Sequence, residues 1–272
     1  EIPKRDWSSD VCSSDLFSAP VRVNAVAGEA RVSGEIAPRV TLTPRRNQPP
    51  IMTVSYNERN GGTQIKTARS IDGGATFSAP AALQRTGAAG DRGWLASTVD
   101  NRGRLHVIWL DHRGLASEHE MHKGAEDGVA MAQKSGLYYA TPGGTERELF
   151  RGVCYCCKTA MAAGPDGTIY AAWRHVFEGN MRDMAFTMSR NGGESFEPLT
   201  RVNEDGWSIA GCPDDGPAMA VDDRSTVHLV WPTVKADRGV ILYAASTDGK
   251  RFSAPVQVPT RGGTKEIGRA HV

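Results

Sequence analysis

Four segments of the chain alternate apolar and polar residues and end on an aromatic residue. They span residues 51–56, 104–109, 168–173 and 226–231, and they close on Tyr56, Trp109, Trp173 and Trp231. Alternation with a period of two, rich in β-branched and aromatic residues, is typical of strands. The closing aromatic residues are 53 to 64 residues apart, enough for one four-stranded antiparallel sheet with its turns. The pattern therefore predicts an all-β chain that repeats such a sheet about four times.

A second apolar segment follows each of these strands, at residues 65–77, 137–144, 184–196 and 241–252, and three of the four contain a similar turn. The turns read S-I-D-G-G-A-T-F, S-R-N-G-G-E-S-F and S-T-D-G-K-R-F. The carboxylate or amide of such a turn accepts backbone N–H groups, glycine supplies a positive φ, and the aromatic residue closes the hairpin. We expect a structural role for the turn residues, which are Ser70, Asp72, Gly74, Thr76, Phe77, Ser189, Asn191, Gly193, Phe196, Ser246, Asp248 and Phe252.

The three turns resemble the Asp-box (BNR) repeat, S-x-D-x-G-x-T-[FW], of the sialidase and neuraminidase-like superfamily. The resemblance covers nearly all of residues 17–265. It implies a β-propeller fragment, with about four four-stranded antiparallel blades out of six. It also implies a protein that binds or hydrolyses a glycan, in the manner of an exo-α-sialidase, in the periplasm or outside the cell.

Both ends of the chain differ in character from the repeats. Residues 6–16 (D-W-S-S-D-V-C-S-S-D-L) and 266–272 (E-I-G-R-A-H-V) resemble translated sequencing-adapter DNA. We therefore expect residues 1–16 and 266–272 to be foreign and residues 17–265 to form the propeller fragment, so that a signal sequence is not observable.

The composition limits the classes of partner that we expect the chain to bind. A formal net charge of +1 gives no indication of nucleic-acid binding, and no apolar run is long enough for a membrane span. A glycan or another small molecule is the ligand that we expect.

The order of strands within a blade predicts two distinct faces. The turns between the first and second strands and between the third and fourth strands share one face. The loops between the second and third strands lie on the other face, together with the segments that precede each first strand. In sialidase-like propellers that other face bears the ligand site.

Cysteines gather on the predicted site face. Aligning A-M-A at 160–162 with A-M-A at 218–220 places Cys154 opposite Cys212, and places Cys156 and Cys157 opposite Asp214 and Asp215. A Cys154–Cys212 disulfide between two blades is one interpretation. The second is a metal or redox site to which Cys154, Cys156, Cys157 and Cys212 contribute thiolates. The third is a set of inert buried thiols.

Candidate ligand-binding residues occupy the same face: Arg174, His175, Arg182 and Trp207. A guanidinium group suits the carboxylate of an acidic sugar. Ion pairing inside the protein is the alternative for the two arginines. Acid–base candidates are Asp183, Asp205, Asp214 and Asp215. The H-E-M-H tetrapeptide at 119–122 is interpreted as part of a solvated polar loop.

The chain departs from the catalytic pattern of sialidases at several points. Residues 37–40 (A-P-R-V) match the F-R-I-P segment poorly, and no carboxylate lies between Arg59 and the structural Asp72. Tyr155 is the only tyrosine expected near the axis, and it is not a convincing nucleophile. Activity as a glycoside hydrolase is therefore left open. The alternative function is a non-catalytic scaffold whose cysteine site binds a metal, a ligand or a partner.

Overall fold

The computed structural model describes residues 18–31, 36–59, 63–83, 90–115, 127–209 and 213–259. The two terminal stretches interpreted as foreign, the tetrapeptide at 119–122 and Cys212 lie outside the described residues. The predicted boundaries of the propeller at residues 17 and 265 therefore stay a prediction.

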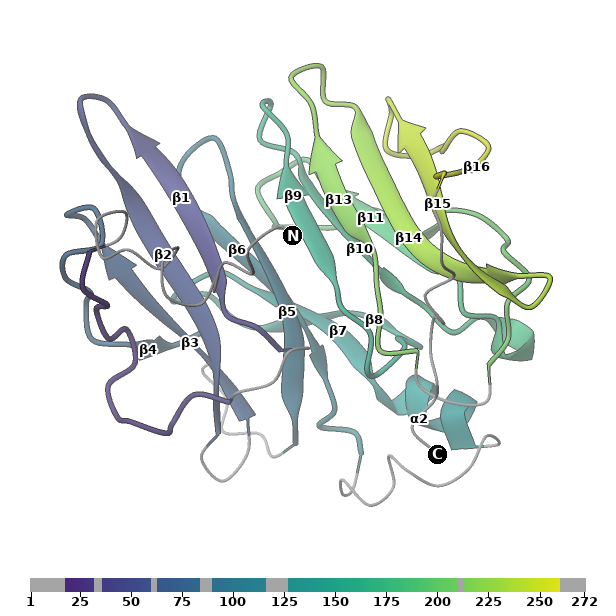
Figure 1. Ribbon diagram of the computed structural model, residues 1–272, viewed down its shortest axis with the longest axis horizontal. Helices are drawn as coiled ribbons and strands as arrows, with labels where there is room; N and C mark the ends of the chain where they lie inside the picture. Colours follow the sequence, from purple (N-terminus) through teal and green to yellow (C-terminus); the bar gives the residue numbers. More distant parts are fainter. Residues whose placement is uncertain are drawn as a thin grey trace, which may run out of the picture.

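The described residues form four antiparallel sheets, each made of four consecutive strands in sequence order (Figure 1). We call these sheets blades 1 to 4. Blade 1 contains β1 (Arg39–Arg45), β2 (Gln48–Arg59), β3 (Thr63–Ser70) and β4 (Ala81–Ala82). Blade 2 contains β5 (Arg92–Val99), β6 (Leu105–Asp111), β7 (Gly136–Ala140) and β8 (Arg147–Arg151). Blade 3 contains β9 (Ala160–Ala163), β10 (Ile169–Arg174), β11 (Met184–Ser189) and β12 (Thr200–Arg201). Blade 4 contains β13 (Ala218–Val221), β14 (Val227–Lys235), β15 (Arg238–Ser246) and β16 (Val256–Gln257).

The first strands of the blades lie side by side in the order β1, β5, β9 and β13, and each sheet extends outward from its first strand (Figure 1). This arrangement is a partial β-propeller, so the predicted fold class is confirmed. Among the described residues, helical structure is confined to the loops between second and third strands, as α2 (Asp127–Lys134) and the 3-10 turn η2 (Glu178–Asn180). In the described part of the chain, no helix is long and apolar enough to cross a membrane.

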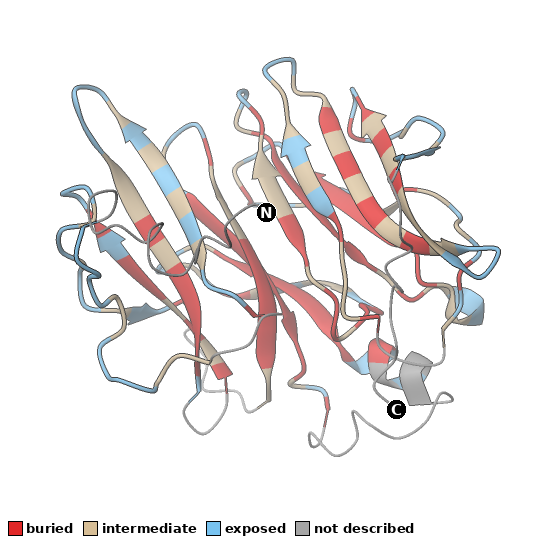
Figure 2. Ribbon diagram, viewed as in Figure 1, coloured by how far each residue is buried: buried red, intermediate tan, exposed pale blue. Residues whose placement is uncertain are grey.

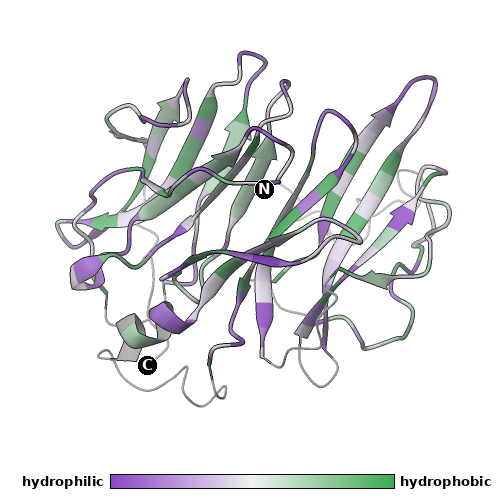
Figure 3. Ribbon diagram, turned by 180° about the vertical axis from the view of Figure 1, so that it is seen from behind, coloured by the Kyte–Doolittle hydropathy of each residue, from purple (hydrophilic) through white to green (hydrophobic). Residues whose placement is uncertain are grey.

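Burial differs between the middle and the outer blades (Figure 2). Every residue of β6, β7, β10 and β11 is buried, because blades 2 and 3 have a neighbour on both sides. In blade 4, β14 alternates between buried and half-buried residues, so one of its two faces is covered. The strands carry most of the hydrophobic residues, and the turns are mainly hydrophilic (Figure 3).

The aromatic residues that close the alternating segments form the core. Trp109, Trp173 and Trp231 lie on the second strands of three blades and are buried, with at most 1% of their surface exposed. Each indole N–H has an acceptor. Trp109 Nε1 donates to Asp111 Oδ2 (3.0 Å) and Trp231 Nε1 donates to Asp205 Oδ2 (2.7 Å). Pairing the polar atom lets a large ring be buried without the cost of an unsatisfied donor.

The three similar turns share one hydrogen-bond pattern. In blade 1, the Thr76 N–H and hydroxyl donate to the carboxylate of Asp72 (3.0 and 2.6 Å), and the Gly74 N–H donates to Ser70 Oγ (2.8 Å). The two bonds from Thr76, with one from the Ser70 hydroxyl, lower the pKa of Asp72 to about 2. In blade 3, Asn191 accepts the N–H of Ser195 (2.9 Å).

The shorter turn of blade 4 uses a carboxylate in the same way. The N–H groups of Arg251 and Lys250 donate to Asp248 (2.9 and 2.8 Å), and they lower its pKa to about 2. A carboxylate or amide that accepts several local donors fixes the turn, which is the structural role expected for these residues.

Blades 2 and 4 share a second structural unit at their first turns. His106 Nδ1 meets the hydroxyl of Tyr139 (2.7 Å) and His106 Nε2 meets Asp100 Oδ2 (3.2 Å). The same contacts join His228 to Tyr243 (2.8 Å) and Asp222 (3.4 Å) in blade 4. Each unit ties a turn to the second and third strands of its blade.

Candidate functional site

The third strand of blade 3 has a candidate site residue at one end and one of the three turns at the other. Asp183 immediately precedes β11, and Ser189, which begins the turn, ends it. Six strand residues separate the two ends by roughly 20 Å. The loop segment that contains α2 lies at the lower edge of Figure 1, on the face opposite the three turns. We call this face the site face.

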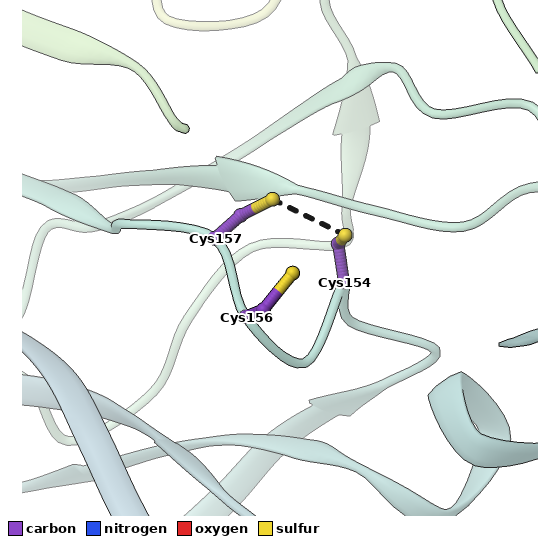
Figure 4. Close-up of side chains that lie close together, drawn as sticks. All are labelled: Cys154, Cys156 and Cys157. Atoms are coloured by element: carbon purple, nitrogen blue, oxygen red, sulfur yellow. Dashed lines mark hydrogen bonds between the residues drawn. The ribbon is translucent and has the colours of Figure 1, made fainter. Parts of the chain in front are cut away.

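Three cysteines occupy the segment that precedes β9, and their sulfur atoms point toward one another (Figure 4). All three side chains are buried, and their sulfur atoms lie within 4.8 Å of one another. Cys154 and Cys157 are free thiols with Sγ atoms 3.2 Å apart. Cys156 is disulfide-bonded.

The free thiol of Cys154 differs from the Cys154–Cys212 disulfide that the alignment favoured. A tight turn accounts for the difference, because the Cys157 N–H donates to the Cys154 carbonyl (3.2 Å) and so brings these two side chains together. The neighbour of Cys154 is therefore Cys157 in the same turn. The alignment had instead predicted a neighbour on the adjacent blade.

Arg182 contacts the thiol pair. Its Nη1 donates to Cys154 Sγ (3.2 Å), and its Nε donates to Asn180 Oδ1 (3.0 Å). The hydrogen bond from Cys157, together with the positive charges of Arg182 and Arg174, lowers the pKa of Cys154 to about 7. Burial raises the pKa of Cys157 well above its usual value. The pair therefore consists of one acidic thiol and one that stays protonated.

Both terminal nitrogens of Arg174 are engaged by the protein, whereas its Nε is buried without a hydrogen-bond partner. Its Nη1 donates to the carbonyl of Arg182 (2.6 Å), and its Nη2 donates to Asp215 Oδ1 (2.5 Å) and to the carbonyl of Pro232 (2.8 Å). The guanidinium also stacks over the Trp207 ring at 4.9 Å. These contacts join blades 3 and 4 at their inner ends. They correspond to the ion-pairing alternative weighed for the arginines.

Asp183 and Asp205, two other predicted acids, also have internal partners, as Asp215 has in Arg174. Asp183 is fully buried, pairs with Arg201 and accepts the N–H of Asp205 (3.1 Å). Burial raises the pKa of Asp183 in spite of that arginine. Asp205 accepts the indole N–H of Trp231. Asp214 and Asp215 are half-buried.

Trp94 and His112 are site-face residues that the sequence analysis did not single out. The two rings lie 5.5 Å apart, and the Tyr155 ring lies 6.3 Å from His112. The Thr159 hydroxyl donates to the carbonyl of Trp94 (2.7 Å), which fixes blade 3 against blade 2. Trp94 lies in the segment D-R-G-W at 91–94, at the position equivalent to the cysteine segment of blade 3. Aligning this segment as well would have identified it.

Backbone strain and buried polar atoms without a partner both occur in these segments. Trp94 and Asp214 both have φ of 51°, a left-handed conformation that is unfavourable for residues other than glycine. Trp94 Nε1, both ring nitrogens of His112 and Asp215 Oδ2 are buried without a hydrogen-bond partner. His112 approaches the Tyr155 backbone without hydrogen-bond geometry. Both features are typical of functional sites.

His175, predicted to bind a ligand, packs among aromatic rings at the end of β10. Trp173 Nε1 donates to its Nδ1 (3.3 Å), and the Phe177 ring lies 4.7 Å away. An indole nitrogen only donates, so Nδ1 must be the unprotonated nitrogen. Burial lowers the pKa of His175 to about 4.

We expect His175 to make the protein less stable as the pH falls from about 6.5 towards 4. The unfolded chain binds a proton over this range and the folded chain does not, so acid favours unfolding. Urea unfolding at several pH values should show a smaller decline in His175→Phe than in the wild type. The same decline in both proteins would contradict the assignment.

No family model and no curated protein matches the chain. Solved structures do match. A Hadza microbial sialidase, Hz136, superposes with a TM-score of 0.55 at 15% identity, over 81% of this chain and 45% of that one. A PL25 ulvan lyase superposes with a TM-score of 0.52 at 11% identity, over 80% of this chain and 54% of that one. The six-bladed, fucose-recognising lectin of Aleuria aurantia gives 0.51 at 16% identity, over 89% of this chain and 66% of that one.

These likenesses establish the propeller fold, since identities this low carry no further information. The chain spans less than half the length of the sialidase.

Proposed function

We propose that the chain is part of a glycan-binding propeller and that the sugar contacts Tyr155, Asp214 and Asp215 on the site face. The observation that carries the proposal is the position of Tyr155. Its half-buried ring lies within the electrostatic range of Asp214 and contacts the ring of His112, which in turn packs against Trp94. An aromatic face next to carboxylates offers apolar contact to the C–H groups of a sugar and acceptors for its hydroxyls.

Further support comes from the proteins that share the fold. The printed names of the matched structures include a sialidase, a fucose-recognising lectin and an ulvan lyase, all proteins that act on or bind carbohydrate. The repeated turn chemistry of blades 1, 3 and 4 supports assigning these turns as Asp boxes of the sialidase-like superfamily.

In this proposal the two buried arginines position the site. Arg174 holds Asp215 in place and Arg182 holds the cysteine segment that carries Tyr155. From the sequence alone, both arginines are candidates for binding the carboxylate of an acidic sugar. With both terminal nitrogens of Arg174 engaged by the protein, Asp214 and Asp215 become the better candidates for direct contact.

Binding is favoured over hydrolysis by the state of Tyr155. Burial raises the pKa of its phenol, and the neighbouring Cys154 raises it further. Among the described residues, no carboxylate accepts a hydrogen bond from the Tyr155 hydroxyl. A tyrosine nucleophile needs a general base to remove its proton, so an exo-α-sialidase activity would need a group beyond those described.

The test is a glycan array that includes sialosides, fucosides and uronate-containing oligosaccharides, followed by calorimetric titration of the best ligand. We expect Tyr155→Ala to weaken binding by about tenfold or more, which corresponds to about 1.4 kcal/mol. Tyr155→Phe should weaken binding by about threefold through the loss of one hydrogen bond.

Tyr243→Phe is the matched control, because it removes a phenolic hydroxyl next to the blade 4 turn and should leave affinity unchanged. The proposal fails if the folded wild type binds no glycan, or if Tyr155 and Tyr243 variants behave alike. Release of free sugar from the same ligands would show that hydrolysis accompanies binding.

A further inference from the structure

Two free thiols lie close enough to form a bond after a small movement. The Sγ atoms of Cys154 and Cys157 are 3.2 Å apart, and both side chains are buried within one tight turn. A disulfide bond is about 2.05 Å long, so an approach of about 1 Å would join the two sulfur atoms. Figure 4 shows both side chains directed at each other.

The two thiols differ in the way that oxidation chemistry requires. Cys154 has the lowered pKa, and Arg182 Nη1 at 3.2 Å stabilises its thiolate. Cys157 has the raised pKa and keeps its proton. A thiolate is the form that attacks an oxidant, and a neighbouring thiol is the group that then resolves the oxidised sulfur.

A metal ion suits these sulfur atoms less well than a covalent bond does. Two thiolates on one tetrahedral Zn²⁺, with Zn–S bonds of about 2.3 Å, lie about 3.8 Å apart. The observed separation is 3.2 Å, and Cys156 is already disulfide-bonded. Arg182 contacts Cys154, and the charge of Arg174 also acts on both free thiols. These two positive charges repel a metal cation and so disfavour its binding at the two sulfur atoms.

We infer that Cys154 and Cys157 form a redox-active pair that hydrogen peroxide converts into a disulfide. Because both thiols are buried, the oxidant must be small and uncharged. The Cys154 thiolate attacks one peroxide oxygen, so that an S–O bond forms, the O–O bond breaks and the released hydroxide takes up a proton. The Cys157 sulfur then attacks the Cys154 sulfur, so that an S–S bond forms and the S–O bond breaks, and the Cys157 proton passes to the departing hydroxide, which leaves as a second water. In sum, two thiols and one peroxide give one disulfide and two waters.

Differential labelling of the tryptic peptide 152–158 tests the inference, because this peptide carries all three cysteines. Thiols that are free at sampling receive a light iodoacetamide label under denaturing conditions. Reduction then exposes disulfide sulfurs to a heavy label. Cys154 and Cys157 should change together from light to heavy after peroxide treatment, while Cys156 is heavy throughout.

Two further measurements sharpen the test. In Cys157→Ser, oxidation should stop at the sulfenic acid of Cys154, and the dimedone adduct should exceed that of the wild type by about tenfold. Glutathione disulfide, which is much larger than peroxide, should oxidise the native pair at least about tenfold more slowly at equal concentration.

Several outcomes would overturn the inference. After peroxide treatment, these are a light label that persists on both cysteines, a change from light to heavy at Cys154 alone, or a form of the two cysteines that takes neither label. Equal rates of oxidation by peroxide and by glutathione disulfide would also overturn it. The wild-type labelling decides the matter even if Cys157→Ser does not fold. The readout is independent of glycan binding, so failure of either proposal leaves the other standing.

Discussion

Replacing Arg174 with alanine should lower the free energy of unfolding by about 3–5 kcal/mol. The side chain is fully buried, and its loss would leave the carboxylate of Asp215 and the carbonyls of Arg182 and Pro232 without a donor. The cost therefore comes from the partners left behind as much as from the lost contacts. Urea unfolding followed by circular dichroism measures it directly.

Two control proteins separate this effect from charge removal in general. Arg151→Ala breaks the exposed Arg151–Glu148 pair, which should cost less than about 1 kcal/mol. Arg174→Met combined with Asp215→Leu removes both charges and should recover most of the stability. If Arg174→Ala is no worse than Arg151→Ala, Arg174 is not the structural link between blades 3 and 4.

Trp109→Ala should also lower the free energy of unfolding by about 3–5 kcal/mol. The ring has no exposed surface and lies in the cluster that joins blades 1 and 2, next to Val107 and Tyr138. Its removal creates a cavity that the paired strands β5 and β7 cannot close. Thermal unfolding monitored by calorimetry should show a large fall in the transition temperature.

Trp109→Phe divides the effect into packing and hydrogen bonding. It keeps most of the ring but leaves Asp111 Oδ2 without the indole donor, so we expect an intermediate loss. Val40→Ala, at a position that is 61% exposed on β1, should change stability by less than about 0.5 kcal/mol. Similar values for the Val40 and Trp109 variants would show that Trp109 is not part of the core.

Period-two alternation predicted the strands because it records which side chains meet a neighbouring blade. The closing tryptophans, the turns and the separation of two faces follow from that pattern and from local turn chemistry. Ser70 and Asp72, for example, are two residues apart and bond to each other (2.7 Å), so their interaction is encoded locally.

The details of the candidate site depend on contacts between residues far apart in the chain. Arg174 reaches Asp215, 41 residues later, and the carbonyl of Pro232, 58 residues later. No local pattern distinguishes an arginine satisfied in this way from one that faces a ligand. The predicted pairing of Cys154 with Cys212 was wrong for the opposite reason. The alignment compared residues on different blades, whereas the actual contact of Cys154 lies within its own turn.

Backbone geometry at the site has a consequence for engineering. Trp94 and Asp214 occupy a conformation that costs about 1–2 kcal/mol for a residue with a side chain and almost nothing for glycine. At Trp94, glycine would also remove a buried ring at a cost of about 3–5 kcal/mol, which exceeds the backbone gain, so selection for heat resistance would favour glycine only at Asp214. That change would remove a carboxylate of the proposed glycan site, so under this proposal thermostability and ligand recognition compete at Asp214.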